Sequence, residues 1–209
     1  MAQPSARRRL LVLVPVLALL AGAARLFAED LDPAKLFDSA RRHHAEKHYG
    51  RCLADLQVLV GEIGRLRVEA IKGLFPDAPS GFSAEDAEGA TAGGLALLGA
   101  GTQVKRTYRR DESSLEATIW ADAGLALQGF QMLLQNPALL GDGRQMVTVK
   151  GRKALLEYDK EAKRGTLTVV LGGVGGMVQL TGAEFAKDEL VDKLGAAFDY
   201  DRIEKELSN

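Results

Sequence analysis

Two stretches in the first third of the chain place residues at the three- and four-residue steps of a helix. The first contains Leu36, Phe37, Ala40 and His44, after an Asp32-Pro33 pair that suits a helix start. The second runs from Leu53 to Leu74 and ends near Gly73 and Phe75-Pro76. Tyr49-Gly50 separates the two stretches. They predict an antiparallel helical hairpin over residues 29–75.

A Gly- and Pro-rich connector or flap is expected over residues 76–102. Beyond it, apolar and polar residues alternate with the period of two that is typical of β-strands. TQVKRTYRR and LEATIWADA alternate around DESS and predict a β-hairpin. An apolar helix is expected in GLALQGFQMLLQNPALL, followed by the strands RQMVTVKG, RKALLEYDK, RGTLTVVLG and MVQLTG. The last 26 or so residues predict a closing helix with Phe185, Leu190, Leu194 and Phe198 facing inward. Strands in runs favour an α+β fold, in which residues 103–209 form an antiparallel sheet with helices packed on one face.

Two stretches resemble known families. The order of elements over residues 76–200, with MVQLTG leading into KDELVDKLGAAFD, resembles the PsbP-like fold and related exported domains of unknown function. This resemblance implies a non-catalytic binding or assembly factor. EKHYGRCLADLQ is similar to the middle of one tetratricopeptide repeat, with Tyr49 and Cys52 as packing residues. Such repeats need about three units for a continuous core, so a single copy implies only a docked helical pair.

The N-terminus has the order of a secretory signal peptide. Arg7, Arg8 and Arg9 precede an uncharged apolar run, and residues 21–23 and 26–28 are two candidate cleavage sites of the A-x-A type. The run covers residues 10–24, which is shorter than the ~20 residues that span a bilayer. We expect residues 1–28 to be removed, no stable membrane insertion afterwards, and a periplasmic or secreted location in a bacterial envelope.

Charge excludes some partners. The first 28 residues include four arginines and no acid, so the other 181 residues carry 23 basic and 28 acidic side chains, a net charge of −5. This balance disfavours nucleic acid and anionic membranes as partners. KRTYRR is a short basic strand, and acids follow it at once. We expect it to be a solvated edge strand rather than a site for an anionic polymer.

All three histidines and the only cysteine fall within RRHHAEKHYGRC, residues 41–52. His44 and His48 are four apart, so on one helix face they could bind a transition metal, with His43 and Cys52 as further candidates. A specific site needs three or four ligands, and the simpler interpretation is a polar helix face with His44 partly tucked against the second helix. Cys52 could also be a catalytic nucleophile, but the sequence contains no segment that resembles an oxyanion loop. The simpler interpretation is that Cys52 packs in the core.

No catalytic constellation emerges, and no cofactor is expected. Two apolar segments, LALLGAG and FQMLLQNPALL, could instead cover a cavity or offer a surface to a partner, although core filling explains them too. The hypothesis is a non-enzymatic envelope protein that binds a protein partner or a small apolar ligand through Leu97, Leu98, Phe130, Met132 and Leu133. The alternative is a metal-binding protein that uses His43, His44 and His48.

Overall fold

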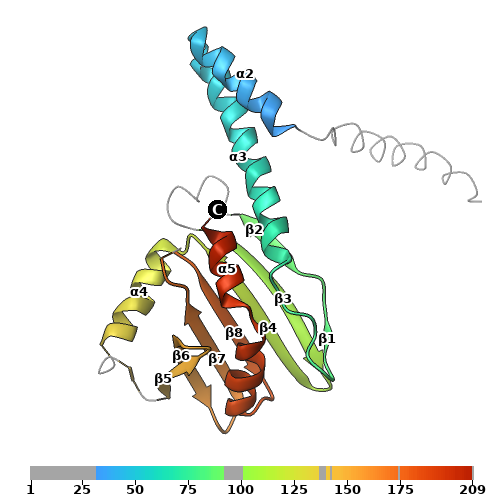
Figure 1. Ribbon diagram of the computed structural model, residues 1–209, viewed down its shortest axis with the longest axis vertical. Helices are drawn as coiled ribbons and strands as arrows, with labels where there is room; N and C mark the ends of the chain where they lie inside the picture. The colour runs from blue at the N-terminus through green and yellow to red at the C-terminus, as the bar shows by residue number, and fades with distance from the viewer. Residues whose placement is uncertain (1–31, 92–100, 137–139, 142, 174, 209) are drawn as a thin grey trace, which may run out of the picture. The chain divides into compact units, whose positions relative to one another are not determined.

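The computed structural model describes residues 32–91, 101–136, 140–141, 143–173 and 175–208 (Figure 1). The chain divides into two compact units, Met1–Leu59 and Val60–Asn209, and the boundary falls inside helix α3. No helix among the described residues is long and apolar enough to cross a membrane.

The first unit contains the predicted helical hairpin, which is confirmed. Helix α2 spans Pro33–Ala45, and the Asp32 carboxylate caps it by accepting a hydrogen bond from the Ala34 N–H at 3.0 Å. Helix α3 spans Tyr49–Lys72. The chain reverses at Lys47, which has a φ of 60°, so the break precedes Tyr49-Gly50 rather than occurring at it. Tyr49 and Gly50 therefore belong to the first turn of α3.

The second unit is built on one antiparallel sheet in the order β1-β3-β4-β8-β7-β6-β5, with β2 also paired to β3. The strands are β1 (Ser83–Ala84), β2 (Glu88–Thr91), β3 (Thr102–Arg110), β4 (Ser113–Ala121), β5 (Arg144–Val149), β6 (Arg152–Asp159), β7 (Arg164–Val170) and β8 (Met177–Ala183). The α+β prediction is confirmed. Strands β1 and β2 lie in the predicted connector, where they are too short to show an alternating pattern.

One face of the sheet carries the core. Alternate residues of the central strands, such as Leu115, Leu167 and Leu180, are almost fully buried there. The C-terminal segment packs on this face as η3 (Glu189–Leu194), η4 (Gly195–Ala197) and α5 (Tyr200–Leu207), joined by the end of α3. The four residues predicted to face inward are all buried. The expected single helix is interrupted because Phe198 has extended backbone angles, φ −76° and ψ 139°.

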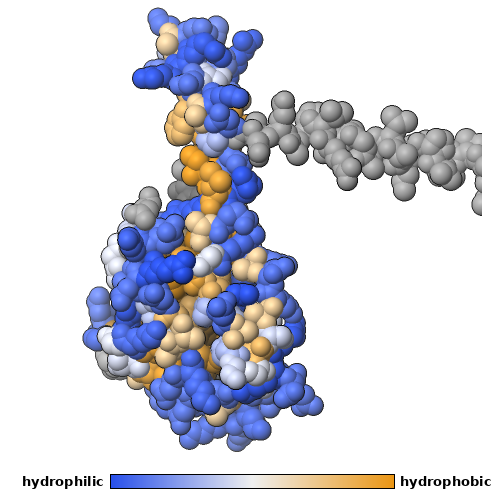
Figure 2. Space-filling model, turned by 45° about the vertical axis from the view of Figure 1, so that its right-hand side comes forward, coloured by the Kyte–Doolittle hydropathy of each residue, from blue (hydrophilic) through white to orange (hydrophobic). Residues whose placement is uncertain are grey.

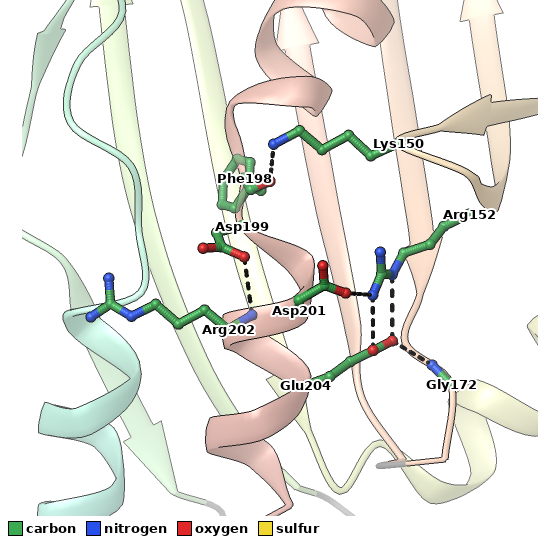
Figure 3. Close-up of polar contacts among 8 residues, drawn as sticks. All are labelled: Lys150, Arg152, Gly172, Phe198, Asp199, Asp201, Arg202 and Glu204. Carbon is green, nitrogen blue, oxygen red and sulfur yellow. Dashed lines mark hydrogen bonds and ion pairs between the residues drawn. The ribbon is translucent and has the colours of Figure 1, made fainter.

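Polar contacts fasten α5 to the sheet (Figure 3). The Arg152 guanidinium, at the start of β6, donates to Asp201 Oδ1 at 2.7 Å and to Glu204 Oε2 at 2.8 Å. Glu204 Oε1 also accepts the N–H of Gly172, after β7, at 2.9 Å. One glutamate thus ties the last helix to two separate strands, and these hydrogen bonds raise the pKa of Arg152.

The other face of the sheet is covered at one end only. Helix α4 (Gly124–Gln135) contacts β6 and β7 there, and Leu127 and Leu155 are buried. The C-terminal helices thus pack on one face, as expected, and α4 adds a partial cover to the opposite one. The rest of this second face is not covered by a helix of the described residues and is accessible to a ligand. We call it the open face.

Candidate binding site on the open face of the sheet

A row of polar side chains crosses the open face, one from each of the strands β3 to β8. Strand register places them as direct cross-strand neighbours. In sheet order they are Thr107, Glu116, Thr181, Thr166, Glu157 and Arg144. Five inter-strand spacings of about 4.8 Å make this row roughly 24 Å long. Such a polar row is what an antiparallel sheet presents to water when only its other face is packed on the core, and we call it the polar floor.

The floor lies under a hollow of about 1280 Å³. A smaller hollow of about 180 Å³ lies at the side of α4 and is lined by Phe130, Leu133 and Leu155. Arg144, Glu157 and Thr166 line both hollows, so the two adjoin each other. We call the pair the sheet recess. It combines a long polar floor with one apolar corner.

The charges of the recess are largely balanced within the protein. Arg144 and Glu157 form an ion pair across β5 and β6, and Lys105 lies 3.7 Å from Glu116. The Thr166 and Thr181 hydroxyls are 3.4 Å apart and stay partly accessible. None of the described residues that line the recess is a histidine or a cysteine. Such a surface recognises a ligand by hydrogen bonds and by an apolar contact rather than by net charge.

The predicted binding residues are divided. Phe130 and Leu133 line the apolar corner of the recess. Met132, between them in sequence, is 59% exposed and lines neither hollow. Leu97 and Leu98 lie outside the described residues. The sequence analysis missed the polar floor, although threonines and charges at every second position of the strands were a visible signal. What it lacked was the strand order that lines them up.

The histidines do not form the expected helix face. Because α2 ends at Ala45, His48 lies beyond it, and the prediction that His44 and His48 share one face is wrong. His44 is exposed with its ring against that of Tyr49, and His48 Nδ1 lies 3.2 Å from Glu46. The described residues contain no group of three or more His, Cys, Asp or Glu side chains that could hold a metal.

It is His43, not His44, that reaches the second helix. Its Nδ1 lies 2.8 Å from Asp55 Oδ2 on α3. A hydrogen bond from Ser39 lowers the pKa of Asp55, with smaller contributions from His43 and Arg42. Cys52 is a partly buried free thiol, whereas Tyr49, expected as a packing residue, is 62% exposed. The His43–Asp55 contact joins the two helices of the hairpin.

The basic strand KRTYRR is not an edge strand, which corrects the prediction. It lies in β3, which pairs with β4 on one side and with β1 and β2 on the other. Its cations have partners within the protein: Lys105 has Glu116, Arg106 donates to the Glu85 and Pro76 carbonyls, and Arg109 pairs with Glu85. The strand is therefore committed to internal contacts rather than to an anionic polymer.

Comparison with known proteins gives no match: no family model fits the chain, and neither a curated protein nor a solved structure is similar to it. The resemblances to the PsbP-like fold and to a tetratricopeptide unit stay predictions. What the sheet recess binds has to be inferred from its own chemistry.

Proposed function

We propose that the protein is a non-enzymatic exported protein of the bacterial envelope that binds an extended segment of a protein partner in the sheet recess. The observation that carries this proposal is that the polar floor and the apolar corner adjoin each other and share Arg144, Glu157 and Thr166. A segment with one apolar anchor and several polar side chains matches both parts at once.

Size favours a protein segment over a small apolar ligand. The apolar corner has about 180 Å³, which is below the roughly 300–1,000 Å³ of sites that enclose small molecules. It is large enough for the tip of one aliphatic or aromatic side chain. The floor, roughly 24 Å long, matches about seven residues of extended chain at about 3.3 Å each.

Chemistry agrees with this assignment. Threonine hydroxyls can donate and accept hydrogen bonds, and the Arg144–Glu157 pair offers donors and acceptors side by side. The resemblance to the PsbP-like fold, which implies a binding or assembly factor, supports the same class of function. The signal-peptide pattern of residues 1–28 supports an exported location.

Site-specific photo-crosslinking tests the proposal. A photoreactive amino acid at Thr166 in the recess should capture a defined partner in cells, whereas one at the exposed Lys205 on α5 should not. Leu133→Asp should reduce the Thr166 product at least tenfold, because a charged carboxylate replaces the apolar surface that would hold the anchor side chain.

Met132→Asp is the matched control, since Met132 lies next to Leu133 on α4 but outside the recess. It should leave the Thr166 product unchanged. The proposal is contradicted if Thr166 and Lys205 capture the same product, or if both aspartate variants reduce capture equally.

A further inference from the structure

Helix α3 carries an apolar stripe that nothing described in the structure covers. Its residues follow one another at steps of four, three, four and three, so they lie on one side of the helix. They are Tyr49, Leu53, Leu56, Val60 and Ile63, with 62, 58, 40, 58 and 44% exposure respectively. Figure 2 shows hydrophobic residues at the surface of α3. We call these five residues the α3 stripe.

The α3 stripe is not the side on which α3 meets α2. Asp55, which bonds His43 of α2 at 2.8 Å, lies roughly 120° round the helix from the centre of the stripe. The stripe ends at Arg67, which occupies the next position of the same spacing and pairs with Asp122 at 2.6 Å. Helix α2 therefore packs on a different side of α3 from the α3 stripe.

Charge is segregated on the same helix. At about 100° per residue, the positions beside the stripe belong to uncharged residues, among them Gly50, Gln57 and Gly64. The charged residues Arg51, Asp55, Glu62 and Arg65 lie on the opposite side. Steps of four and three are the spacing by which helices pack against one another as coiled coils or bundles.

We propose that the α3 stripe is the interface between two copies of this chain, whose hairpins associate through it. Its uncharged margins create no like-charge repulsion between identical surfaces, and they offer nothing that selects a charged partner. A membrane surface is disfavoured, because helices that lie on membranes are rich in Lys and Arg on their polar face, whereas this one mixes both signs.

The exposed area is sufficient for self-association. From the exposed fractions, the five side chains offer about 500 Å² per copy, or about 1,000 Å² in a symmetric pair, which is near the lower limit for a specific interface. The pairing is thus expected to be specific and concentration-dependent rather than obligate. This inference is independent of the sheet recess, which lies on the sheet.

Sedimentation analysis of the purified chain from 1 to 100 μM tests it, in the concentration range where such a weak pair titrates. The wild-type protein should show a monomer–dimer equilibrium. Leu53→Glu and Val60→Glu, made separately, should each raise the dimer dissociation constant at least 100-fold, because each places a carboxylate inside the apolar interface.

Val58→Glu is the matched control, since Val58 is 43% exposed on the same helix but lies among the charged residues on its other side. It should change the dissociation constant by less than about threefold, as expected of a residue outside the interface. Circular dichroism should show unchanged helix content for all three variants. A wild-type monomer at 100 μM, or equal loss of the dimer in all three variants, would overturn the proposal.

Discussion

The two faces of the sheet are made by the same strands and differ in almost every other respect. In β7, Leu167 faces the core and has 0% exposure, whereas its neighbour Thr166 faces the recess and stays partly accessible. The core face is covered by η3, η4, α5 and the end of α3, and the open face only in part by α4. Alternation along one strand therefore separates residues that stabilise the fold from residues that are available to a ligand.

This separation has an energetic reason. Buried aliphatic side chains stabilise the fold through apolar area removed from water, about 25 cal/mol per Å². Hydroxyls and ion pairs that remain near water contribute little, because they exchange one set of hydrogen bonds for another. Substitutions on the open face are thus expected to change binding without unfolding the protein, and those on the core face the reverse.

The sharpest test of the comparison uses adjacent residues of β7. Leu167 pairs across strands with Leu156 and Leu180, both also at 0% exposure. Leu167→Ala should lower the free energy of unfolding by about 2–5 kcal/mol, since it leaves a cavity in a closed core. Thr166→Ala should change it by less than about 0.5 kcal/mol. Urea denaturation followed by circular dichroism measures both.

Equal losses for the two alanine variants would contradict the comparison, because they would mean that the open face is as closely packed as the core. Thr166→Val is a useful companion to Thr166→Ala. It keeps the volume and β-branching of threonine and removes only the hydroxyl. It should therefore leave stability unchanged.

Much of this fold could be predicted from residue patterns. Period-two alternation identified β3 and β4, three- and four-residue steps identified α2 and α3, and apolar segments bounded by turn residues indicated α4 and β5 to β8. The glycines of LGGVGG, where Gly173 and Gly175 have positive φ, fit the turn between β7 and β8. The two short strands β1 and β2 left no such signal, because pairing with β3 rather than their own composition defines them.

The site was less accessible to prediction for a related reason. Phe130 and Leu133 could be singled out because they belong to a surplus apolar segment. The polar floor depends on which strands are neighbours, and β4 next to β8 is a pairing of segments far apart in the sequence. His43 was passed over in favour of His44 because the end of α2 depends on the reversal at Lys47, which no residue type there announces.

A second test concerns the rim of the core face, where Arg152 holds α5 (Figure 3). The Glu204 side chain is 25% exposed and bonds both Arg152 and the Gly172 N–H, whereas the Asp201 side chain is 89% exposed. Glu204→Ala should lower the free energy of unfolding by about 1–2 kcal/mol, since the Gly172 N–H loses its acceptor and the partly buried Arg152 keeps only the exposed Asp201.

Asp201→Asn is the control for this ion-pair cluster and should cost less than about 0.5 kcal/mol, because water competes for so exposed a carboxylate. Thermal unfolding of both variants distinguishes them. If Asp201→Asn lowered the stability more than Glu204→Ala, the attachment of α5 would depend on surface charge rather than on the partly buried contacts of Glu204.

The smallest effect is expected from removing single ion pairs, one on each face of the sheet. On the core face, Glu189 bonds Arg110 at 2.6 and 3.1 Å, and the Arg110 guanidinium lies 4.5 Å from the centre of the Phe82 ring. The hydrogen bond from Arg110 lowers the pKa of Glu189. On the open face, Glu157 pairs with Arg144, and both side chains are more than 40% exposed. Glu189→Gln should cost about 1 kcal/mol at pH 7, and Glu157→Gln less than about 0.5 kcal/mol.

The stability that the Glu189–Arg110 ion pair contributes should also depend on pH. A carboxylate whose pKa is lowered by folding stabilises the protein above the pKa it has when unfolded, and this contribution is lost as the pH falls through its folded pKa. The difference in free energy of unfolding between wild type and Glu189→Gln should therefore be full at pH 7 and close as the solution is acidified below about 4.5, the ordinary value for glutamate. A Glu189→Gln difference that persisted unchanged below about pH 4 would contradict this expectation, because the ionised Glu189 carboxylate would then not be the source of the stability. The ion pair on the core face would in that case stabilise the fold no more than the exposed Arg144–Glu157 pair on the open face does.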